Sequence, residues 1–449
     1  MFRDKMALLV AWKDAPQRMP LMIKGARQVG KTWLIRELGR SFDDFVEVNF
    51  EKRPEAKELF ARDLRPERLV SELSAFAGQR LVAGRTLLFL DEIQECPAAL
   101  ASLRYFHEEL PELHVAAAGS LLNFVLDKVA TGVGRVSYLH VYPMTFGEFL
   151  VAAGEGILRE RILAQSLSEP LPQTHHAHLL DLVRHYMLLG GMPAVLARYF
   201  HDRDIIACLA LQNDLITSFL DDFHKYGSLA EIGWLSAVFR SVPVQLGRKF
   251  KFVSVDPGVK SVHLARALDL LEMAGVAHRV IHSSADGVPL AARLRSNRFK
   301  VVFFDTGLAQ RLLNVDLAHW MTQVDIETVN GGALAEQFVG QELAALNDAG
   351  PLRPMTYWHR EARGASAEVD YLVEKGSTVL PIEVKRGLQG GMKSMHLFLK
   401  EKKSTRGVKV SKLGFSDDGT VTSVPFYALE RLSRGTADAW LPRSGTAAS

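Results

Sequence analysis

The sequence has little of three features that would each point to a particular class of protein: cysteine, long apolar runs, and an excess of charge of one sign. Only Cys96 and Cys208 occur in 449 residues, which is too few for a disulfide framework or a four-cysteine metal site. No run of about 18 apolar residues is present, and the charged N-terminus lacks the apolar core of a secretion signal. We therefore expect neither export nor a membrane span, and a reducing, cytoplasmic location.

Charge is nearly balanced, with a formal net charge of +3. That excess is too small to require a nucleic-acid or membrane partner, so any basic surface must be local. Apolar residues make up 48% of the chain and charged residues 23%, which is typical of a folded globular protein. At about one domain per 150 residues, the length predicts roughly three modules.

The pattern of residues along the chain predicts an α/β protein with several parts. In residues 1–152, short apolar runs alternate with helical patterns, which favours βαβ units and a buried parallel sheet. The strand-like runs are Leu21–Lys24, 45–50, 87–90 and 114–118. Open α/β sheets bind ligands at the carboxyl ends of their strands, so we expect the chemistry at that edge.

The remainder of the chain predicts four further segments. Residues 153–228 read as helices, forming a lid or linker, and residues 229–300 read as two helices followed by a strand, which suggests a winged-helix-like module. Residues 301–431 predict a second α/β domain with a helix over 334–346, and residues 432–449 form a small, polar tail.

One eight-residue segment between a strand and a helix matches the phosphate-loop, or Walker A, pattern. Glycines let backbone N–H groups close around phosphate oxygens, and the following helix N-terminus favours an anion. Lys31 would reach the β and γ phosphates of a nucleotide, and the Thr32 hydroxyl would bind Mg²⁺. The predicted nucleotide-binding residues are Gly25, Ala26, Arg27, Gln28, Val29, Gly30, Lys31 and Thr32.

A second motif ends the apolar strand at residues 87–90 with two adjacent carboxylates, Asp91 and Glu92. Asp91 would hold Mg²⁺ and Glu92 would activate the attacking water in phosphoryl transfer. Ser120, after the next strand, would place a hydroxyl near the γ-phosphate, or simply form a strand-end turn. Arg135 would supply transition-state charge in cis or in trans, with a structural ion pair as the alternative.

Short motifs spread over most of the chain resemble a family of prokaryotic AAA-type ATPases. In that family an AAA-type domain is joined to a C-terminal domain of unknown function with a restriction-endonuclease-like core. The resemblance implies ATP hydrolysis with Mg²⁺, supports the roles of Lys31, Thr32, Asp91, Glu92 and Ser120, and places Arg135 in a recurring Gly-Arg motif. The matching residues are the phosphate loop, 49–51, 90–94, 118–120, 133–136, 142–146, 190–193, 305–309 and 381–385.

Carboxylates in the last domain resemble the PD-(D/E)xK nuclease pattern. Asp370 lies on one predicted strand, Glu383 and Lys385 lie on one face of the next, and Glu336 lies on a helix. On this hypothesis the three acids would bind a metal and Lys385 would assist the attacking water. The alternative is a nuclease-like scaffold kept for packing or binding, with these charges in salt bridges.

Two basic stretches, residues 293–300 and 400–412, would contact phosphate backbones or form solvated faces. The leading interpretation is a multidomain ATPase that uses ATP and Mg²⁺ to drive conformational change, with DNA or RNA, a protein partner or further copies of the chain as candidate partners. The alternatives are an ATP-gated metal-dependent nuclease and a non-enzymatic nucleotide-dependent interaction module. A preference for ATP over GTP does not follow from these motifs.

Overall fold

A computed structural model describes residues 1–119, 134–225, 228–315, 332–347, 353–360, 367–385 and 392–434. The chain forms two compact units. The N-terminal unit comprises Met1–Tyr142 with Met273–Gly275, and the C-terminal unit comprises Pro143–Glu272 with the chain from Val276 onward. Within the described ranges, no helix combines the length and the apolar character needed to cross a bilayer.

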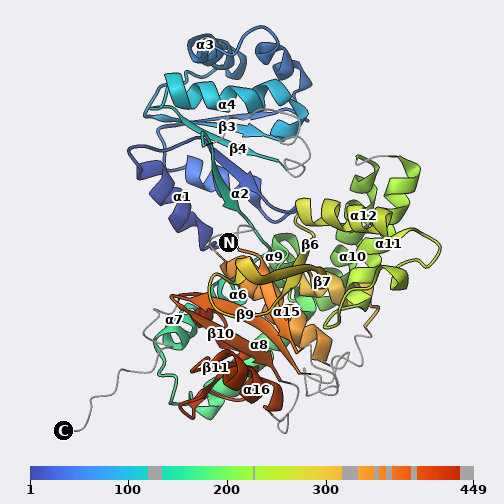
Figure 1. Ribbon diagram of the computed structural model, residues 1–449. Coiled ribbons are helices and arrows are strands. Elements are labelled where there is room, and N and C mark those ends of the chain that lie inside the picture. The colour runs from blue at the N-terminus through green and yellow to red at the C-terminus, as the bar shows by residue number, and fades with distance from the viewer. Residues whose placement is uncertain are drawn as a thin grey trace. The chain divides into compact units, whose positions relative to one another are not determined.

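The N-terminal unit is built on a five-stranded, wholly parallel sheet with the order β2-β3-β4-β1-β5. Helices α3 and α4 lie on one side of it and α1 and α2 on the other (Figure 1). The strands are β1 (Leu21–Lys24), β2 (Asp44–Asn49), β3 (Thr86–Asp91), β4 (His114–Ala118) and β5 (Ser137–His140). The helices are α1 (Lys5–Asp14), α2 (Lys31–Gly39), α3 (Pro66–Ala77) and α4 (Pro97–Glu109), with 3₁₀ turns at Pro54–Phe60 and Ile93–Glu95.

Burial explains why the parallel sheet was predictable. Every residue of β3 and β4 is buried, as expected for parallel strands covered by helices on both faces, and such strands read as continuous apolar runs. The expected parallel α/β arrangement is confirmed, with the first four strands within one residue of their predicted bounds. The sequence pattern missed β5, because its four residues include the polar Ser137 and His140 and show no apolar run.

The C-terminal unit contains a mixed eight-stranded sheet with the order β12-β13-β11-β10-β9-β8-β6-β7. Helix α16 packs on one face, where Trp358, Val369, Leu372, Met395 and Phe398 form a buried apolar cluster. The strands are β6 (Ala277–Ser283), β7 (Leu294–Phe303), β8 (Met355–His359), β9 (Glu368–Lys375), β10 (Thr378–Val384), β11 (Gly407–Ser411), β12 (Ser416–Asp417) and β13 (Val421–Pro425).

Helices account for most of the remaining described residues of this unit. Those between residues 143 and 273 are α6 (Phe146–Ala152), α7 (Gly156–Ala164), α8 (Gln173–Leu189), α9 (Pro193–Asp202), α10 (Ile205–Asp222), α11 (Leu229–Val244) and α12 (Ser261–Met273). The later ones are α13 (Thr306–Leu312), α15 (Ala333–Leu346), α16 (Lys393–Lys402) and α17 (Glu430–Arg434).

The segment expected to be winged-helix-like, residues 229–300, contributes α11, α12 and the antiparallel pair β6–β7. This pair continues the large sheet, because β6 also pairs in parallel with β8, and the expected boundary at residue 300 falls inside β7. The partner strand, β8, lies more than 50 residues later in the sequence, so the local pattern could not reveal the pairing.

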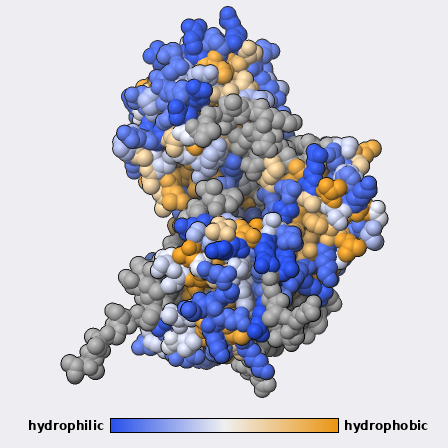
Figure 2. Space-filling view, viewed as in Figure 1, coloured by the Kyte–Doolittle hydropathy of each residue, from blue (hydrophilic) through white to orange (hydrophobic). Residues whose placement is uncertain are grey.

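Leu229 on α11 and Val262 on α12 are 84% and 67% exposed, and Figure 2 shows apolar patches on this part of the surface.

Two glycine-containing motifs that the sequence singled out fit into each other in the core of this unit. Asp305 caps α13 by accepting from Leu308 N–H at 2.9 Å, and it also accepts from Gly191 N–H at 2.7 Å. A Cβ on Gly190 would lie 2.2 Å from Asp305 Oδ1, and one on Gly307 would lie 2.5 Å from Leu189 O. The motifs at 190–193 and 305–309 therefore serve close backbone packing.

Candidate nucleotide-binding site

The phosphate loop lies between β1 and α2 and has a backbone that glycine makes possible. Gly25 and Gly30 have φ values of 145° and 96°, in the region that L side chains rarely adopt. A Cβ on Gly25 would lie 2.1 Å from the carbonyl oxygen of Val141. The loop therefore turns directly into α2, whose N-terminal N–H groups favour an anion at this point.

Lys31 is the first residue of α2 and its side chain is buried beneath the loop. Its ammonium donates to the carbonyl oxygens of Gly25 at 2.9 Å and Ala26 at 2.7 Å. Burial lowers the pKa of Lys31 to about 8, although the nearby carboxylates of Glu92 and Asp91 act in the opposite direction. A phosphate group in the loop would supply the negative charge that this buried ammonium lacks.

Asp91 ends β3 at the carboxyl edge of the sheet and lies beside Thr32. The Thr32 hydroxyl donates to the Asp91 carboxylate at 3.3 Å, and Asn49 Nδ2 donates to Asp91 Oδ2 at 2.9 Å. Burial and the adjacent charge of Glu92 raise the pKa of Asp91. A hydroxyl and a carboxylate this close to a phosphate loop form the oxygen-donor set that Mg²⁺ prefers, so these residues fit the ion.

Asn49 is a site residue to which the sequence pattern assigned no role. It ends β2 and lies opposite Asp91 in the parallel register of β2 and β3. The sequence does show a polar residue at the end of an apolar strand. That observation points to Asp91 only once the order of the strands is known, and strand order is part of the tertiary structure. Asn49 orients the carboxylate that would hold the metal.

Glu92 follows Asp91 in the left-handed backbone region, with φ 50° and ψ 44°. A non-glycine residue pays about 1 to 3 kcal/mol for such a conformation, and such strain concentrates at functional sites. The Glu92 carboxylate accepts a hydrogen bond from Gln94 Nε2 at 2.6 Å, so its orientation is constrained. The Glu92 carboxylate is thus held beside Asp91, the residue that would bind the metal, where a water-activating base would be needed.

Of the other two predicted catalytic residues, Arg135 does not join this group in the structure. Ser120 lies outside the described residues. Arg135 lies two residues before β5, whose first residue aligns with Leu21 at the start of β1, whereas the phosphate loop follows the end of β1. Arg135 Nε donates to Glu108 Oε1 at 2.8 Å and lowers the pKa of that carboxyl. Within its own chain, Arg135 therefore lies at the opposite edge of the sheet from the loop.

The C-terminal carboxylates are arranged around a lysine that the sequence had placed on a basic, phosphate-facing stretch. Lys300 is 3% exposed, and its ammonium lies 2.8 Å from Glu336, 2.5 Å from Glu368 and 3.5 Å from Asp370. Although burial lowers the pKa of Lys300, the three acids raise it well above its usual value. Lys300 thus supplies the positive charge that a bound metal would bring.

The remaining predicted nuclease residues are also engaged within the protein. Lys385 forms an ion pair with Glu383, and Asp370 Oδ2 accepts from Val384 N–H at 2.8 Å. In the described part of the chain, no group of three His, Cys, Asp or Glu side chains is arranged to hold a metal ion. The structure gives the nuclease hypothesis no support. The charges form salt bridges with one another, as in the alternative of a scaffold kept for packing or binding.

Comparisons with known proteins agree with the site in the N-terminal unit. The AAA domain family matches residues 17–150, so the fold and the site define this unit as an AAA-type P-loop domain. Two domains of unknown function, DUF8612 and DUF4143, match residues 180–319 and 331–424. The search of curated proteins found no match.

Among solved structures, the Walker-type ATPase of Pyrococcus abyssi is 16% identical, with 70% of this chain and 95% of that chain covered and a TM-score of 0.45. The Orc1 protein of Aeropyrum pernix, solved in complex with DNA, is 16% identical over 72% of this chain and 95% of that chain, with a TM-score of 0.29. Both TM-scores are below 0.5.

Removing the Lys300 charge should leave the buried Glu336 carboxylate, and the partly exposed Glu368 and Asp370 carboxylates beside it, without their cation. We expect Lys300→Met to lower the free energy of unfolding by about 3 to 5 kcal/mol, since breaking a buried ion pair on one side is strongly destabilising. Adding Glu336→Gln to that variant should restore part of the loss. Denaturant unfolding measures both effects, with the exposed Lys393→Met as the control. A Lys300→Met chain as stable as the control would show that Lys300 does not balance the cluster.

Proposed function

We propose that this protein is a Mg²⁺-dependent ATPase whose N-terminal AAA-type unit binds and hydrolyses ATP and drives conformational change in the rest of the chain. The observation that carries the proposal is the position of Thr32 and Asp91, with oxygens 3.3 Å apart directly below the phosphate loop. A strand, a phosphate loop and a helix alone would support nucleotide binding. The acidic strand end beside them supports metal-assisted hydrolysis.

In this mechanism the loop N–H groups and the Lys31 ammonium bind the β and γ phosphates. Lys31 exchanges its contacts with the Gly25 and Ala26 carbonyls for phosphate oxygens, which are stronger acceptors because they are charged. Thr32 and Asp91, the latter oriented by Asn49, would hold Mg²⁺, and the ion would supply positive charge beside the phosphates. Glu92, oriented by Gln94, takes a proton from the attacking water.

Arg135 fits this mechanism only from a neighbouring copy of the chain, because its own phosphate loop lies at the other edge of the sheet. It would then leave Glu108 and approach the γ-phosphate of the adjacent subunit. The proposal therefore includes self-association of the chain as a condition for full turnover.

Lys31→Ala and Glu92→Gln separate nucleotide binding from chemistry. We expect Lys31→Ala to weaken Mg-ATP binding by roughly tenfold to a hundredfold, because it removes a charge-assisted hydrogen bond worth about 1.5 to 3 kcal/mol. Glu92→Gln should keep the affinity and lose on the order of a hundredfold or more in turnover, because it removes the general base. Calorimetry and a steady-state phosphate-release assay measure the two quantities.

The matched control for these variants is Arg62→Ala, an exposed cation in the same unit. Turnover that Glu92→Gln leaves unchanged would remove Glu92 from the role of base. Tight Mg-ATP binding with no turnover in the wild type would favour the alternative of a nucleotide-dependent interaction module.

The lowered pKa of Lys31 predicts how affinity depends on pH. The ammonium must be charged to bind phosphate, and its pKa in the free protein is about 8. Bound phosphate favours the charged form, so the affinity for Mg-ATP should be constant below about pH 7. Above pH 8 it should fall by up to about tenfold per pH unit, as one proton must be taken up. Calorimetry between pH 6.5 and 9.5 tests this, and a flat profile for the wild type would contradict it.

Mixing two inactive variants tests whether Arg135 acts between subunits. We expect Arg135→Ala to reduce turnover on the order of a thousandfold. Mixing Arg135→Ala subunits with Glu92→Gln subunits should restore part of the activity. In the mixed assembly, some interfaces place the intact Glu92 of one subunit beside the intact Arg135 of another. Glu108→Gln is the control, since it breaks the same ion pair and keeps the arginine. Equal effects of Arg135→Ala and Glu108→Gln on melting temperature, with no effect on turnover, would assign Arg135 to the ion pair alone.

A further inference from the structure

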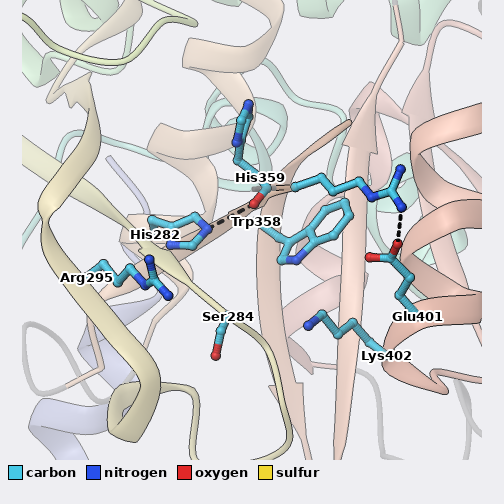
Figure 3. A pocket seen from close by; sticks show the side chains of 8 residues that line it. His282, Ser284, Arg295, Trp358, His359, Glu401 and Lys402 are labelled. Carbon is cyan, nitrogen blue, oxygen red and sulfur yellow. Dashed lines mark hydrogen bonds and ion pairs between the residues drawn. The ribbon is translucent and has the colours of Figure 1, made fainter. Parts of the chain in front are cut away.

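The C-terminal unit has a polar cavity whose lining does not include Lys300 or the acids around it. It has a volume of about 270 Å³ and lies between β6, β7, β8 and the end of α16. We name it the Trp358 pocket, and Figure 3 shows Trp358 between Arg295 on one side and Lys402 and Glu401 on the other. Its volume is close to the lower end of the range of small-molecule sites, which begins at about 300 Å³, so it suits a small ligand.

The pocket brings together the two basic stretches that the sequence had marked as candidate phosphate contacts. Arg295 comes from residues 293–300 on β7, and Lys402 comes from residues 400–412 at the end of α16. Arg360, which follows β8, adds a third cation. Glu401 is the one carboxylate among the lining residues, so the lining carries an excess of positive charge that favours an anion.

Neighbouring carboxylates hold two of these cations at the cavity wall without using all their donors. Lys402 Nζ lies 2.7 Å from Asp286, which is outside the lining and 55% exposed, so water screens its charge. Arg360 lies 3.0 Å from Glu401. An ammonium has three N–H donors and a guanidinium five, and these point in different directions, so one carboxylate engages about two of them at most. Both side chains are therefore positioned in advance for a second anion.

The other lining residues add an aromatic wall and further polar groups. Trp358 is 3% exposed and packs edge-on against Phe398, with ring centroids 5.2 Å apart. His282 is 2% exposed, and its Nε2 lies 3.1 Å from the His359 carbonyl oxygen, which fixes the ring. Ser284 adds a hydroxyl at the lining. A buried aromatic wall lowers the local dielectric constant and so strengthens attraction between the cations and an anion.

We propose that the Trp358 pocket binds a phosphomonoester, with Arg295, Arg360 and Lys402 as the cations that recognise it. Cations from separate elements match a compact dianion, because each can donate to a different phosphate oxygen. The same chemistry occurs in a mononucleotide and at the 5′ end of a nucleic acid, and the cavity is open to solvent, so either source can enter. This inference does not depend on ATP hydrolysis by the N-terminal unit.

The test uses the full chain carrying Lys31→Ala, so that the phosphate loop does not compete for the probes. Calorimetry would compare inorganic phosphate, AMP, adenosine, and one short oligonucleotide with either a 5′-phosphate or a 5′-hydroxyl. We expect AMP or the 5′-phosphorylated oligonucleotide to bind and adenosine not to bind. Which of the two binds more tightly identifies the source of the phosphate.

Variants assign the binding to the Trp358 pocket. Arg295→Ala and Lys402→Gln should each weaken binding about tenfold or more, as expected for the loss of one charge-assisted hydrogen bond. Lys400→Ala is the matched control, because Lys400 is an exposed lysine on the same helix and is not among the lining residues. Arg295 is itself exposed, so its variant should keep the melting temperature of the parent chain.

Three outcomes would overturn the proposal. One is that none of the phosphate-bearing probes binds at millimolar concentration. Another is that Arg295→Ala and Lys402→Gln bind as well as Lys400→Ala. The third is that adenosine binds as tightly as AMP and the 5′-hydroxyl oligonucleotide as tightly as its 5′-phosphorylated form, which would show that the phosphomonoester is not recognised.

Discussion

The carboxylate of Asp91 is the contact on which the candidate site depends, because it joins three segments of the chain. It accepts from Thr32 at the start of α2 and from Asn49 at the end of β2, and it ends β3 itself. These residues meet because the carboxyl ends of parallel strands share one edge of the sheet. The helix that follows β1 therefore begins beside the acids that follow β3. The parallel sheet thus creates the site, and the loop glycines make room for its ligand.

The two units neutralise buried charge in different ways. At the phosphate loop, Lys31 is desolvated and contacts only carbonyl oxygens, so its environment favours an incoming anion. In the C-terminal unit, Lys300 is surrounded by Glu336, Glu368 and Asp370, so the charge is balanced from within. Lys300 is balanced by carboxylates that contact it, whereas Lys31 donates to carbonyl oxygens and keeps a charge that a phosphate group can balance. This difference is why we assign chemistry to the first and packing to the second.

Much of the N-terminal unit could be predicted from sequence, and less of the C-terminal unit. Strands β1, β3 and β4 appear as apolar runs because they are largely buried, and β2 at the sheet edge appears as an alternating apolar pattern. The phosphate loop appears because its glycines have a local backbone purpose. Strand β5 is too short and too polar to stand out. Asn49 gains its role only through its register with Asp91. Lys300 appeared to belong to a basic surface because burial depends on contacts with α15 and β9, which lie far away in the sequence.

The sequence by itself determined the strand, loop and helix that would bind phosphate, and the two acids at the end of β3. These features are local, since each is set by backbone preferences and burial within about a dozen residues. Only the tertiary structure decided which charges meet. It placed Arg135 at the sheet edge opposite its own loop, put Lys300 among the C-terminal carboxylates, and joined Arg295 to Lys402 across one cavity. The physical reason is that ion pairing depends on distance in space, which strand order and long-range pairing set.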